Sequence, residues 1–250
     1  MHYFFKEGQA LVSGRTIELD PVDVNHAHRV LRLGKNSRVA IADGKGSAFS
    51  GTVLSIGPGK VLIRLEKALP AAESPRPIVL LQGLAKGEKM DYIIRQATEL
   101  GVVSIVPVFT ERSIPRFSES REAGRLKRWR SVIRSAAEQC RRSLLPEITS
   151  MHDFSGALAL LRGQKALIPW EGEKELGLNE LLRQSPQEKE AVFLFIGPEG
   201  GFSMVEVAEL TAAGARTVHL GPRILRTETA AAVTIALIQA AWGDLGVGRR

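Results

Sequence analysis

The sequence predicts an α/β protein made of two domains, and three features of the chain support this. Residues 78–250 alternate short, wholly apolar runs with stretches of helical periodicity, which is typical of a mostly parallel sheet covered by helices on both faces. Residues 1–70 contain shorter runs of β-branched or alternating residues, which are typical of a small barrel. Residues 71–77 lie within PAAESPRP, a stretch with three prolines and no periodicity, and are predicted to be a linker.

In the first domain the pattern predicts hairpins and one short helix. The predicted strands are Arg38–Ala42, Ala48–Ile56 and Lys60–Leu65. Turn sequences, Asp-Gly and Gly-Pro-Gly, separate them, so an antiparallel sheet is expected. The stretch Asp23–Leu33 predicts a helix that ends at Gly34, with Asp23 as the candidate cap.

In the second domain, strands and helices are predicted in alternation along the chain. The predicted strands are Ile78–Gly83, Val102–Phe109, Lys165–Ile168, Ala191–Ile196 and Thr217–Leu220. The predicted helices are Lys89–Leu100, Arg125–Arg142, Leu178–Gln184, Met204–Ala213 and Thr229–Trp242. Because the strands are apolar throughout, their sheet is expected to be buried on both faces.

Positive charge is concentrated in one segment of the chain. The sequence has 34 Lys+Arg against 27 Asp+Glu, and residues 112–142 alone hold ten basic residues against three Glu. A second excess, ten basic against six acidic residues, lies in residues 1–72. Arginine beside Trp129 suits phosphate contacts and base stacking. A solvated helix face explains the same charge, so charge alone leaves RNA binding and simple solvation open.

Several classes of protein are excluded by composition. The single cysteine, Cys140, cannot close an intrachain disulfide, and no clustered Cys/His spacing suggests zinc. His26 and His28 have no third ligand in sight, so no metal is expected. The chain shows neither a signal-peptide pattern nor an apolar run long enough to span a bilayer. A cytoplasmic protein without a membrane partner is therefore expected.

The first candidate ligand loop follows the most apolar strand. Residues 196–203 read IGPEGGFS and precede a predicted helix, and ligands of open α/β sheets bind at the carboxyl ends of strands. The loop has neither the spacing of a phosphate-binding P-loop nor that of a Rossmann dinucleotide site, which argues against both. Ser203 and Glu206 have the spacing of a capping box, so that part of the motif is structural.

The second candidate loop is the stretch LGPRILRTETA at residues 220–230. Thr227 is predicted to cap an alanine-rich helix, with Glu228 in its first turn, where a carboxylate favours the helix dipole. A well-capped helix does not explain why Arg223 and Arg226 flank the apolar pair Ile224-Leu225. Apolar residues between cations in a loop are predicted to line a pocket for a partly apolar ligand.

Taken together, these motifs closely resemble those of the RsmE family within the SPOUT methyltransferase superfamily. The resemblance rests on TELG at residues 98–101, GPEGGF at 197–202 and LGPRILRTETA at 220–230, with support from HRVLR at 28–32 and from Glu138-Gln139 with Arg141 and Arg142. Gln96 departs from the family pattern, which has a basic residue there. The resemblance implies an S-adenosylmethionine-dependent methyltransferase that acts on N3 of a uridine in small-subunit (16S) ribosomal RNA. It also implies a PUA-like N-terminal barrel, a trefoil-knotted SPOUT-type α/β domain and a homodimer.

The same resemblance assigns candidate residues to each task. Its cofactor-binding candidates are Ile196, Gly197, Pro198, Glu199, Gly200, Gly201, Leu220, Gly221, Ile224, Leu225, Arg226, Thr227 and Thr229. The candidate RNA-binding residues are His28, Arg29, Arg32, Arg125, Arg128, Arg134, Arg141 and Arg142. We interpret the Leu220-Gly221 turn and the two loops as the walls of the cofactor site.

The chemistry of uracil N3 suggests the catalytic candidates. N3 carries a proton and becomes nucleophilic only when that proton leaves, so the site needs a proton acceptor or cations that stabilise the uracil anion. The candidate cations are Arg226 and Arg112. The candidate carboxylates are Glu199, Glu99 and Glu228, although Glu228 also fits a purely structural role at the start of its helix. Two other functions stay open at this point, a non-catalytic RNA-binding module and a methyltransferase with another RNA or another target atom.

Overall fold

Contacts divide the chain into two compact units. The computed structural model describes residues 1–57, 59–113, 118–184 and 190–247. The first unit comprises Met1–Glu73 together with Arg134–Leu145, and the second comprises Ser74–Ile133 together with Pro146–Arg250. Helix α3 (Glu119–Cys140) therefore contributes residues to both units.

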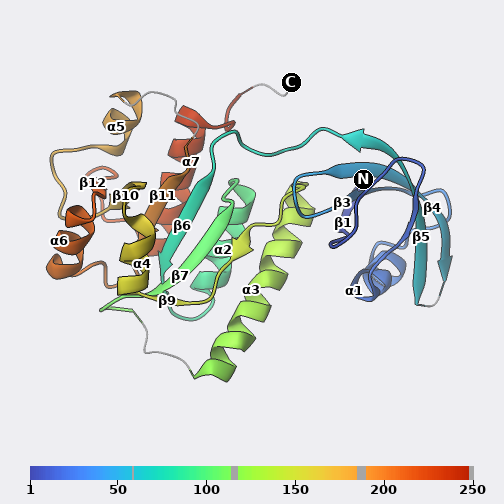
Figure 1. The fold of residues 1–250 in the computed structure, drawn as a ribbon, viewed down its shortest axis with the longest axis horizontal. Coiled ribbons are helices and arrows are strands. Elements are labelled where there is room, and N and C mark those ends of the chain that lie inside the picture. Colours follow the sequence, from blue (N-terminus) through green and yellow to red (C-terminus); the bar gives the residue numbers. More distant parts are fainter. Residues whose placement is uncertain (58, 114–117, 185–189, 248–250) are drawn as a thin grey trace. The chain divides into compact units, whose positions relative to one another are not determined.

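The first unit is a five-stranded sheet with the strand order β1-β3-β4-β5-β2. Four of these strands, β1, β3, β4 and β5, are labelled in Figure 1. The strands are β1 (His2–Phe5), β2 (Thr16–Glu18), β3 (Arg38–Ala42), β4 (Ala48–Gly57) and β5 (Lys60–Leu69). The expectation of an antiparallel sheet was wrong for one pair, because β1 lies parallel to β3 while the other pairs are antiparallel. The pair Phe4 and Phe5 on β1 is buried in the unit, which ties the start of the chain to the sheet.

The helix predicted in this unit is shorter than expected and changes type. Helix α1 (Pro21–Asn25) passes directly into η1 (His26–Val30), one turn of π-helix. Asp20 is the N-cap residue, so the expectation that Asp23 is the cap was wrong. Asp23 is instead buried, and its carboxylate accepts a hydrogen bond from Nη2 of Arg134 at 2.7 Å.

The second unit is a parallel sheet with the order β12-β10-β11-β6-β7-β8, and β9 also pairs with β7. Its strands are β6 (Ile78–Gly83), β7 (Ser104–Phe109), β8 (Glu147–Ile148), β9 (His152–Asp153), β10 (Lys165–Pro169), β11 (Val192–Ile196) and β12 (Arg216–Val218). The predicted α/β class is confirmed, whereas β8 and β9 escaped prediction because two residues carry no periodicity. The trefoil knot stays a prediction.

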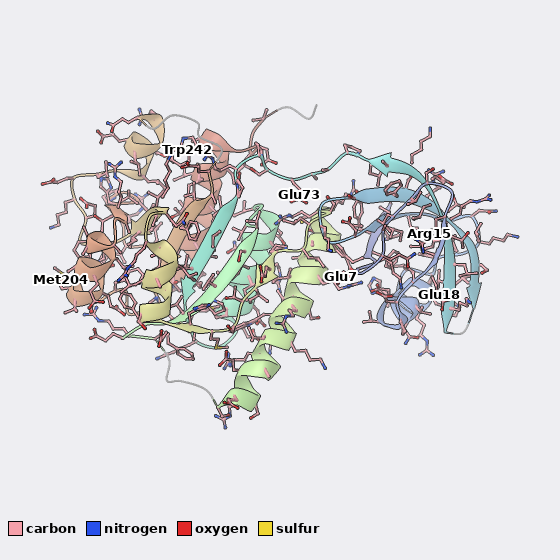
Figure 2. All side chains as sticks on the ribbon, in the orientation of Figure 1. Glu7, Arg15, Glu18, Glu73, Met204 and Trp242 are labelled. Atoms are coloured by element: carbon pink, nitrogen blue, oxygen red, sulfur yellow. The ribbon has the colours of Figure 1, made fainter. Side chains whose placement is uncertain are left out.

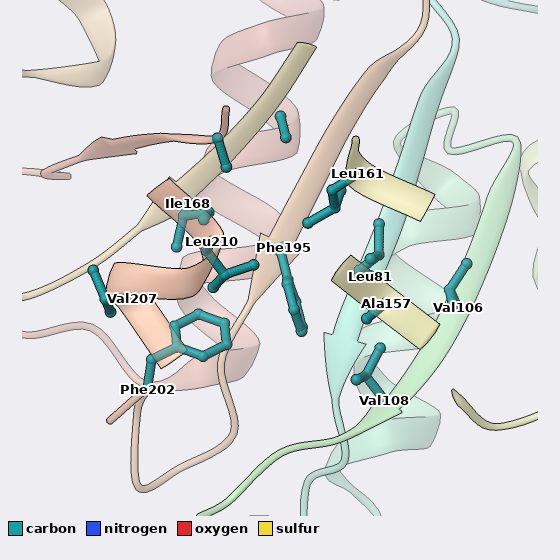
Figure 3. Packing of buried hydrophobic residues seen from close by; sticks show 12 residues of the cluster. Leu81, Val106, Val108, Ala157, Leu161, Ile168, Phe195, Phe202, Val207 and Leu210 are labelled. Carbon is teal, nitrogen blue, oxygen red and sulfur yellow. The ribbon is translucent and has the colours of Figure 1, made fainter. Parts of the chain in front are cut away.

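Six helices of the described chain belong wholly or partly to this unit: α2 (Lys89–Glu99), α3, α4 (Phe154–Leu161), α5 (Leu178–Gln184), α6 (Met204–Ala212) and α7 (Thr227–Trp242). Helices α4 and α6 cover one face of the sheet, where Phe195 packs edge-on against Phe202 with ring centroids 4.9 Å apart (Figure 3). Helices α2 and α7 contact each other, and Figure 1 shows both behind the strands. Within the described ranges, no helix is both long and apolar enough to cross a membrane.

Candidate active site

The loops after the parallel strands meet at one edge of the sheet. The register pairs Ile196 of β11 with Gln82 of β6, and Gln82 with Pro107 of β7, so these strands end side by side. The loop before α2, the loop after β7 and the 197–203 loop therefore lie together. This is the edge at which ligands of open α/β sheets bind.

A cavity of about 600 Å³ opens at this edge. Ten of the predicted cofactor residues line it: Ile196, Gly197, Pro198, Glu199, Gly200, Gly201, Ile224, Leu225, Arg226 and Thr227. The lining also includes Lys89, Pro169, Glu171, Phe202 and Ala230. The two loop motifs, some twenty-five residues apart in the sequence, thus form the walls of one cavity.

A smaller cavity of about 130 Å³ adjoins the first and shares five lining residues with it, Pro169, Glu171, Ile224, Leu225 and Ala230. Leu220 and Gly221, predicted as cofactor residues, line this smaller space, whereas Thr229 lines neither. The turn of the loop depends on Gly221, whose φ of +111° favours glycine.

The 197–203 loop requires glycine at two positions, at one because a neighbouring side chain packs closely and at the other because of the backbone conformation. A Cβ on Gly200 would come within 2.9 Å of the Cβ of Arg112. Gly201 has a φ of +66°, and its N–H donates to the Pro198 carbonyl at 3.0 Å, which closes a tight turn. The predicted capping box is confirmed, since the Ser203 hydroxyl accepts from the N–H of Glu206 and the Glu206 carboxylate accepts from the N–H of Ser203.

A buried relay joins the two loops to the central strand. The Thr227 hydroxyl donates to the Gly197 carbonyl at 2.6 Å, and it accepts from Nε2 of Gln82 at 3.1 Å. Gln82 is fully buried and also donates to the Gly83 carbonyl. Thr227 is the first residue of α7, and Arg226 is the N-cap, so the prediction that Thr227 caps the helix was wrong. Its hydroxyl instead fixes the spacing of the loops.

Glu199 anchors the loop to the start of α2. Its carboxylate accepts from the N–H of Lys86 at 3.0 Å and forms an ion pair with Lys89 at 3.0 Å. Burial acts to raise the pKa of Glu199, but hydrogen bonds from backbone N–H groups and from Lys89 outweigh it, and the pKa lies below its ordinary value. The carboxylate is therefore ionised and held in place, which suits a positioning role better than proton transfer.

Arg112 and Arg226 reach the cavity in different ways. Arg112 follows β7, and its Nη1 donates to the Gly200 carbonyl at 3.0 Å. Arg112 therefore stabilises the glycine loop without lining the cavity. Arg226 is exposed and lines the cavity itself. The structure therefore brings both predicted cations to the same edge, with Arg226 as the one facing the cavity space.

Glu99 is not brought to this site. It ends α2, and the neighbouring Leu100 carbonyl accepts from Nε2 of Gln239 near the far end of α7. Gln239 is twelve residues along α7 from Thr227, which is about 18 Å at 1.5 Å per residue. Glu99 thus lies at the opposite edge of the sheet.

Two carboxylates at the cavities were missed by the sequence analysis. Glu171 and Glu173 follow β10, and the rule that ligands bind beyond the carboxyl ends of strands would have found them. A hydrogen bond from the Thr217 hydroxyl, together with backbone N–H groups of the same loop, lowers the pKa of Glu173 to about 2. Glu173 therefore orders its loop, and Glu171 is the exposed carboxylate that lines both spaces.

The predicted RNA-binding residues divide into exposed and structural groups. Of the predicted RNA-binding residues in the first unit, four are exposed: His28, Arg29, Arg32 and Arg141. In the second unit, Arg125 and Arg128 line an open groove of about 600 Å³ between α3 and the start of α2, where Arg128 forms an ion pair with Asp91. Arg121, Gly124 and Trp129 line the rest of its α3 side.

Arg134 and Arg142 are committed to packing within the first unit. Arg134 forms ion pairs with Asp23, Glu7 and Glu138 and donates to the Phe5 carbonyl. Arg142 is only 3% exposed, and its guanidinium makes two hydrogen bonds to Glu73. These two arginines therefore hold the end of α3 to the first unit. No group of three or more His, Cys, Asp or Glu side chains within the described ranges gathers to hold a metal ion.

Comparison with known proteins places these features in one family. Residues 72–239 match a family described as RNA methyltransferase domain, and residues 19–66 match one described as RNA methyltransferase PUA domain. The ribosomal RNA small subunit methyltransferase E of Buchnera aphidicola is 32% identical over 92% of this chain and 93% of its own length. The enzyme of the same name from Synechocystis is 33% identical over 90% of this chain and 73% of its own.

Solved structures agree with the sequence relatives. The ribosomal RNA small subunit methyltransferase E of Neisseria gonorrhoeae, bound to S-adenosyl methionine, matches with a TM-score of 0.88 and 32% identity, over 98% of this chain and 99% of that one. The resemblance of the loop motifs and the expectation of a PUA-like first domain are both confirmed. The chain belongs to the RNA methyltransferase family that includes the ribosomal RNA small subunit methyltransferases E.

Proposed function

We propose that this protein transfers a methyl group from S-adenosylmethionine to N3 of a uridine in 16S ribosomal RNA of the small subunit. The observation that supports this most directly is the cavity of about 600 Å³ at which the 197–203 loop meets the 224–227 loop. The gonococcal relative is bound to S-adenosyl methionine, and it matches this chain over nearly its whole length.

The residues at the cavity fit this cofactor. Its volume lies within the range of small-molecule pockets, about 300–1,000 Å³. Ile224 is 86% exposed, and with Leu225 it offers an apolar wall for a flat ring such as adenine. The glycine loop offers backbone at close range, and the carboxylate of Glu171 suits the cofactor's positive charge. We therefore assign these loops to cofactor binding.

In the proposed mechanism the protein mainly aligns its reactants. The bound cofactor supplies an electrophilic methyl group on a positively charged sulfur. The Gln82–Thr227–Gly197 relay fixes the two loops relative to each other, and alignment of this kind supplies much of the rate of a displacement reaction. Arg226, exposed at the cavity, stabilises the negative charge on the uracil ring as N3 loses its proton to solvent. Glu199 holds the loop as an ionised carboxylate.

RNA docking is assigned to the exposed basic residues. Residues 1–70 are proposed as the RNA-binding barrel, with residues 134–145 as part of the same unit, 71–77 as the linker and the rest of 78–250 as the methyltransferase domain. His28, Arg29, Arg32 and Arg141 on the first unit, and Arg125 and Arg128 on the second, are the proposed phosphate contacts. Arg134 and Arg142 are left out because their guanidinium groups are both paired and largely buried, whereas the paired Arg128 is exposed. A cytoplasmic homodimer is the proposed working state.

Two measurements test the function. Calorimetry with S-adenosylmethionine is expected to detect binding to the wild-type chain and none to Gly197→Asp, because a Cβ at Gly197 already lies 3.3 Å from the Phe202 ring. Mass mapping of ribosomal RNA from cells that lack the protein is expected to show loss of one N3-methyluridine in 16S RNA. Binding of RNA without binding of the cofactor would instead indicate a non-catalytic module, and loss of a different modification would correct the target.

A further inference from the structure

Another cavity, separate from the two described above, lies at the edge of the sheet opposite the candidate active site. It has a volume of about 260 Å³, and it is lined by the first residues of three parallel strands, Lys165 of β10, Val192 of β11 and Arg216 of β12. The register pairs Lys165 with Val192, and Leu167 with Arg216. The cavity therefore opens where these strands begin, whereas the active-site loops lie where they end.

The walls of this cavity are apolar. Ala166, Leu167, Leu181 and Val192 line it, and each is no more than 5% exposed. Trp242, labelled in Figure 2, closes one side from the last turn of α7, where its indole N–H donates to the Leu182 carbonyl at 3.0 Å. An apolar body that filled the cavity would be removed from water on several sides.

Three cations surround these apolar walls. Arg76 is 3% exposed, its guanidinium lies 5.2 Å from the Trp242 ring centroid, and its Nη1 donates to the Glu190 carbonyl at 2.7 Å. Lys165 lies 3.5 Å from the Glu190 carboxylate, and both side chains are largely exposed. Arg216 is exposed and has no ion-pair partner among the residues that the structure describes. Among the residues that the structure describes, the Glu190 carboxylate thus pairs with Lys165, and its charge also acts on Arg76.

We propose that this cavity binds a small organic anion, an aromatic or branched apolar body that carries one carboxylate. The apolar body fills the space between Leu167, Leu181 and Trp242, and the carboxylate lies at the rim between Lys165 and Arg216. A nucleotide of RNA fits less well, because Arg76 already covers the face of Trp242 on which a base would stack. The site is independent of methyl transfer, since it shares no lining residue with the cofactor cavity.

The test uses a matched pair of probes on the full-length protein. Calorimetric titration with 2-naphthoate and with neutral 2-naphthamide compares an anion with an uncharged molecule of the same shape. We expect the wild-type chain to bind naphthoate at least about tenfold more tightly than naphthamide, which corresponds to one charge-assisted contact. In the double variant Lys165→Ala/Arg216→Ala, naphthoate affinity is expected to fall about tenfold or more, and naphthamide affinity is expected to stay unchanged.

Two controls make the outcome specific. Arg95→Ala removes an exposed arginine of α2 that does not line the cavity, and it is expected to leave naphthoate affinity unchanged. S-adenosylmethionine is expected to bind equally with and without saturating naphthoate. The proposal is overturned if the two probes bind alike, if the double variant binds naphthoate as the wild type does, if the cofactor competes with naphthoate, or if single-stranded RNA displaces naphthoate.

Discussion

The hydroxyl of Thr227 lies 2.6 Å from the carbonyl oxygen of Gly197, a residue thirty positions earlier in the sequence, and this hydrogen bond joins the two loops of the cavity. The same hydroxyl accepts a hydrogen bond from Gln82. One hydrogen-bond network therefore joins the start of α7, the glycine loop and the end of β6. The shape of the cavity between the two loops therefore depends on one buried side chain, that of Thr227.

The first prediction concerns this hydroxyl. Thr227→Val removes both hydrogen bonds and leaves the Gly197 carbonyl unpaired, so the free energy of unfolding is expected to fall by about 1–3 kcal/mol and the Kd for S-adenosylmethionine to rise about tenfold. Thr234→Val is the matched control, since Thr234 is a buried threonine of the same helix whose hydroxyl donates to the Ala230 carbonyl within that helix. Equal losses of cofactor affinity in the two variants would show that Thr227 has no special role. Calorimetry and urea denaturation provide both quantities.

The second prediction concerns Arg226. If its guanidinium stabilises the uracil anion, Arg226→Ala is expected to lower kcat about 10²-fold, and Arg226→Lys, which keeps the charge, is expected to restore part of that loss. The pH at which the rate rises is expected to move upward in Arg226→Ala, because the uracil proton becomes harder to remove. Single-turnover rates between pH 6 and 10 measure this shift. An unchanged pH profile together with a raised KM would assign Arg226 to binding alone.

The third prediction concerns the groove between α2 and α3. Arg125→Ala/Arg128→Ala is expected to weaken RNA binding and to reduce the slope of log K against log[salt] by about 1–2. The reason is that fewer counterions are released from the RNA when fewer of its phosphates are neutralised by the protein. The Kd for S-adenosylmethionine is expected to stay constant. Arg142→Ala serves as the contrast, because removal of a buried partner of Glu73 is expected to lower thermal stability. A parallel loss of cofactor affinity in the groove variant would contradict this division of roles.

The fourth prediction concerns pH and the first unit. Burial, with the neighbouring Asp23, raises the pKa of Glu138 from 4.5 to about 7, despite the opposing effect of Arg134. The folded chain therefore binds this proton more tightly than the unfolded chain does, so stability is expected to fall as pH rises from about 4.5 to about 7. Glu138→Gln is expected to flatten this dependence, and Glu119→Gln, in the first turn of the same helix, is expected to retain it. Urea denaturation at pH 5, 6, 7 and 8 distinguishes the two.

Sequence reasoning predicted the second unit more fully than the first. Apolar runs such as Ile78–Gly83 and Ala191–Ile196 are long enough to fix a strand, and the rule for ligands at strand ends then pointed to both cavity loops. Strand β2 has three residues and β8 has two, so neither carries a periodic signal. The parallel pairing of β1 with β3 depends on contacts between distant segments, which a local pattern does not encode.

For side chains, residue type predicted location better than role. Arg112 and Arg226 were both expected at the site, but only the fold separates the arginine that holds the Gly200 carbonyl from the one that lines the cavity. Arg134 and Arg142 looked like RNA contacts because their partners, Asp23 and Glu73, lie far away in the sequence. A run of basic residues in the sequence therefore predicts a basic surface only once the carboxylates that pair with those residues in the fold are known.

The assignment of Arg134–Leu145 to the first unit has a practical consequence for dissecting the protein. A fragment that stops at residue 73 would lose the guanidinium that pairs with Asp23, and the partners of Glu73 on Arg142, Ser143 and Leu144. Such a fragment would expose the apolar surface that Ala137 covers on Phe5, Ala42 and Ala48. The barrel is therefore not encoded by one contiguous stretch of the gene, and a stand-alone version requires the end of α3 to be grafted back, for example through a circularly permuted chain.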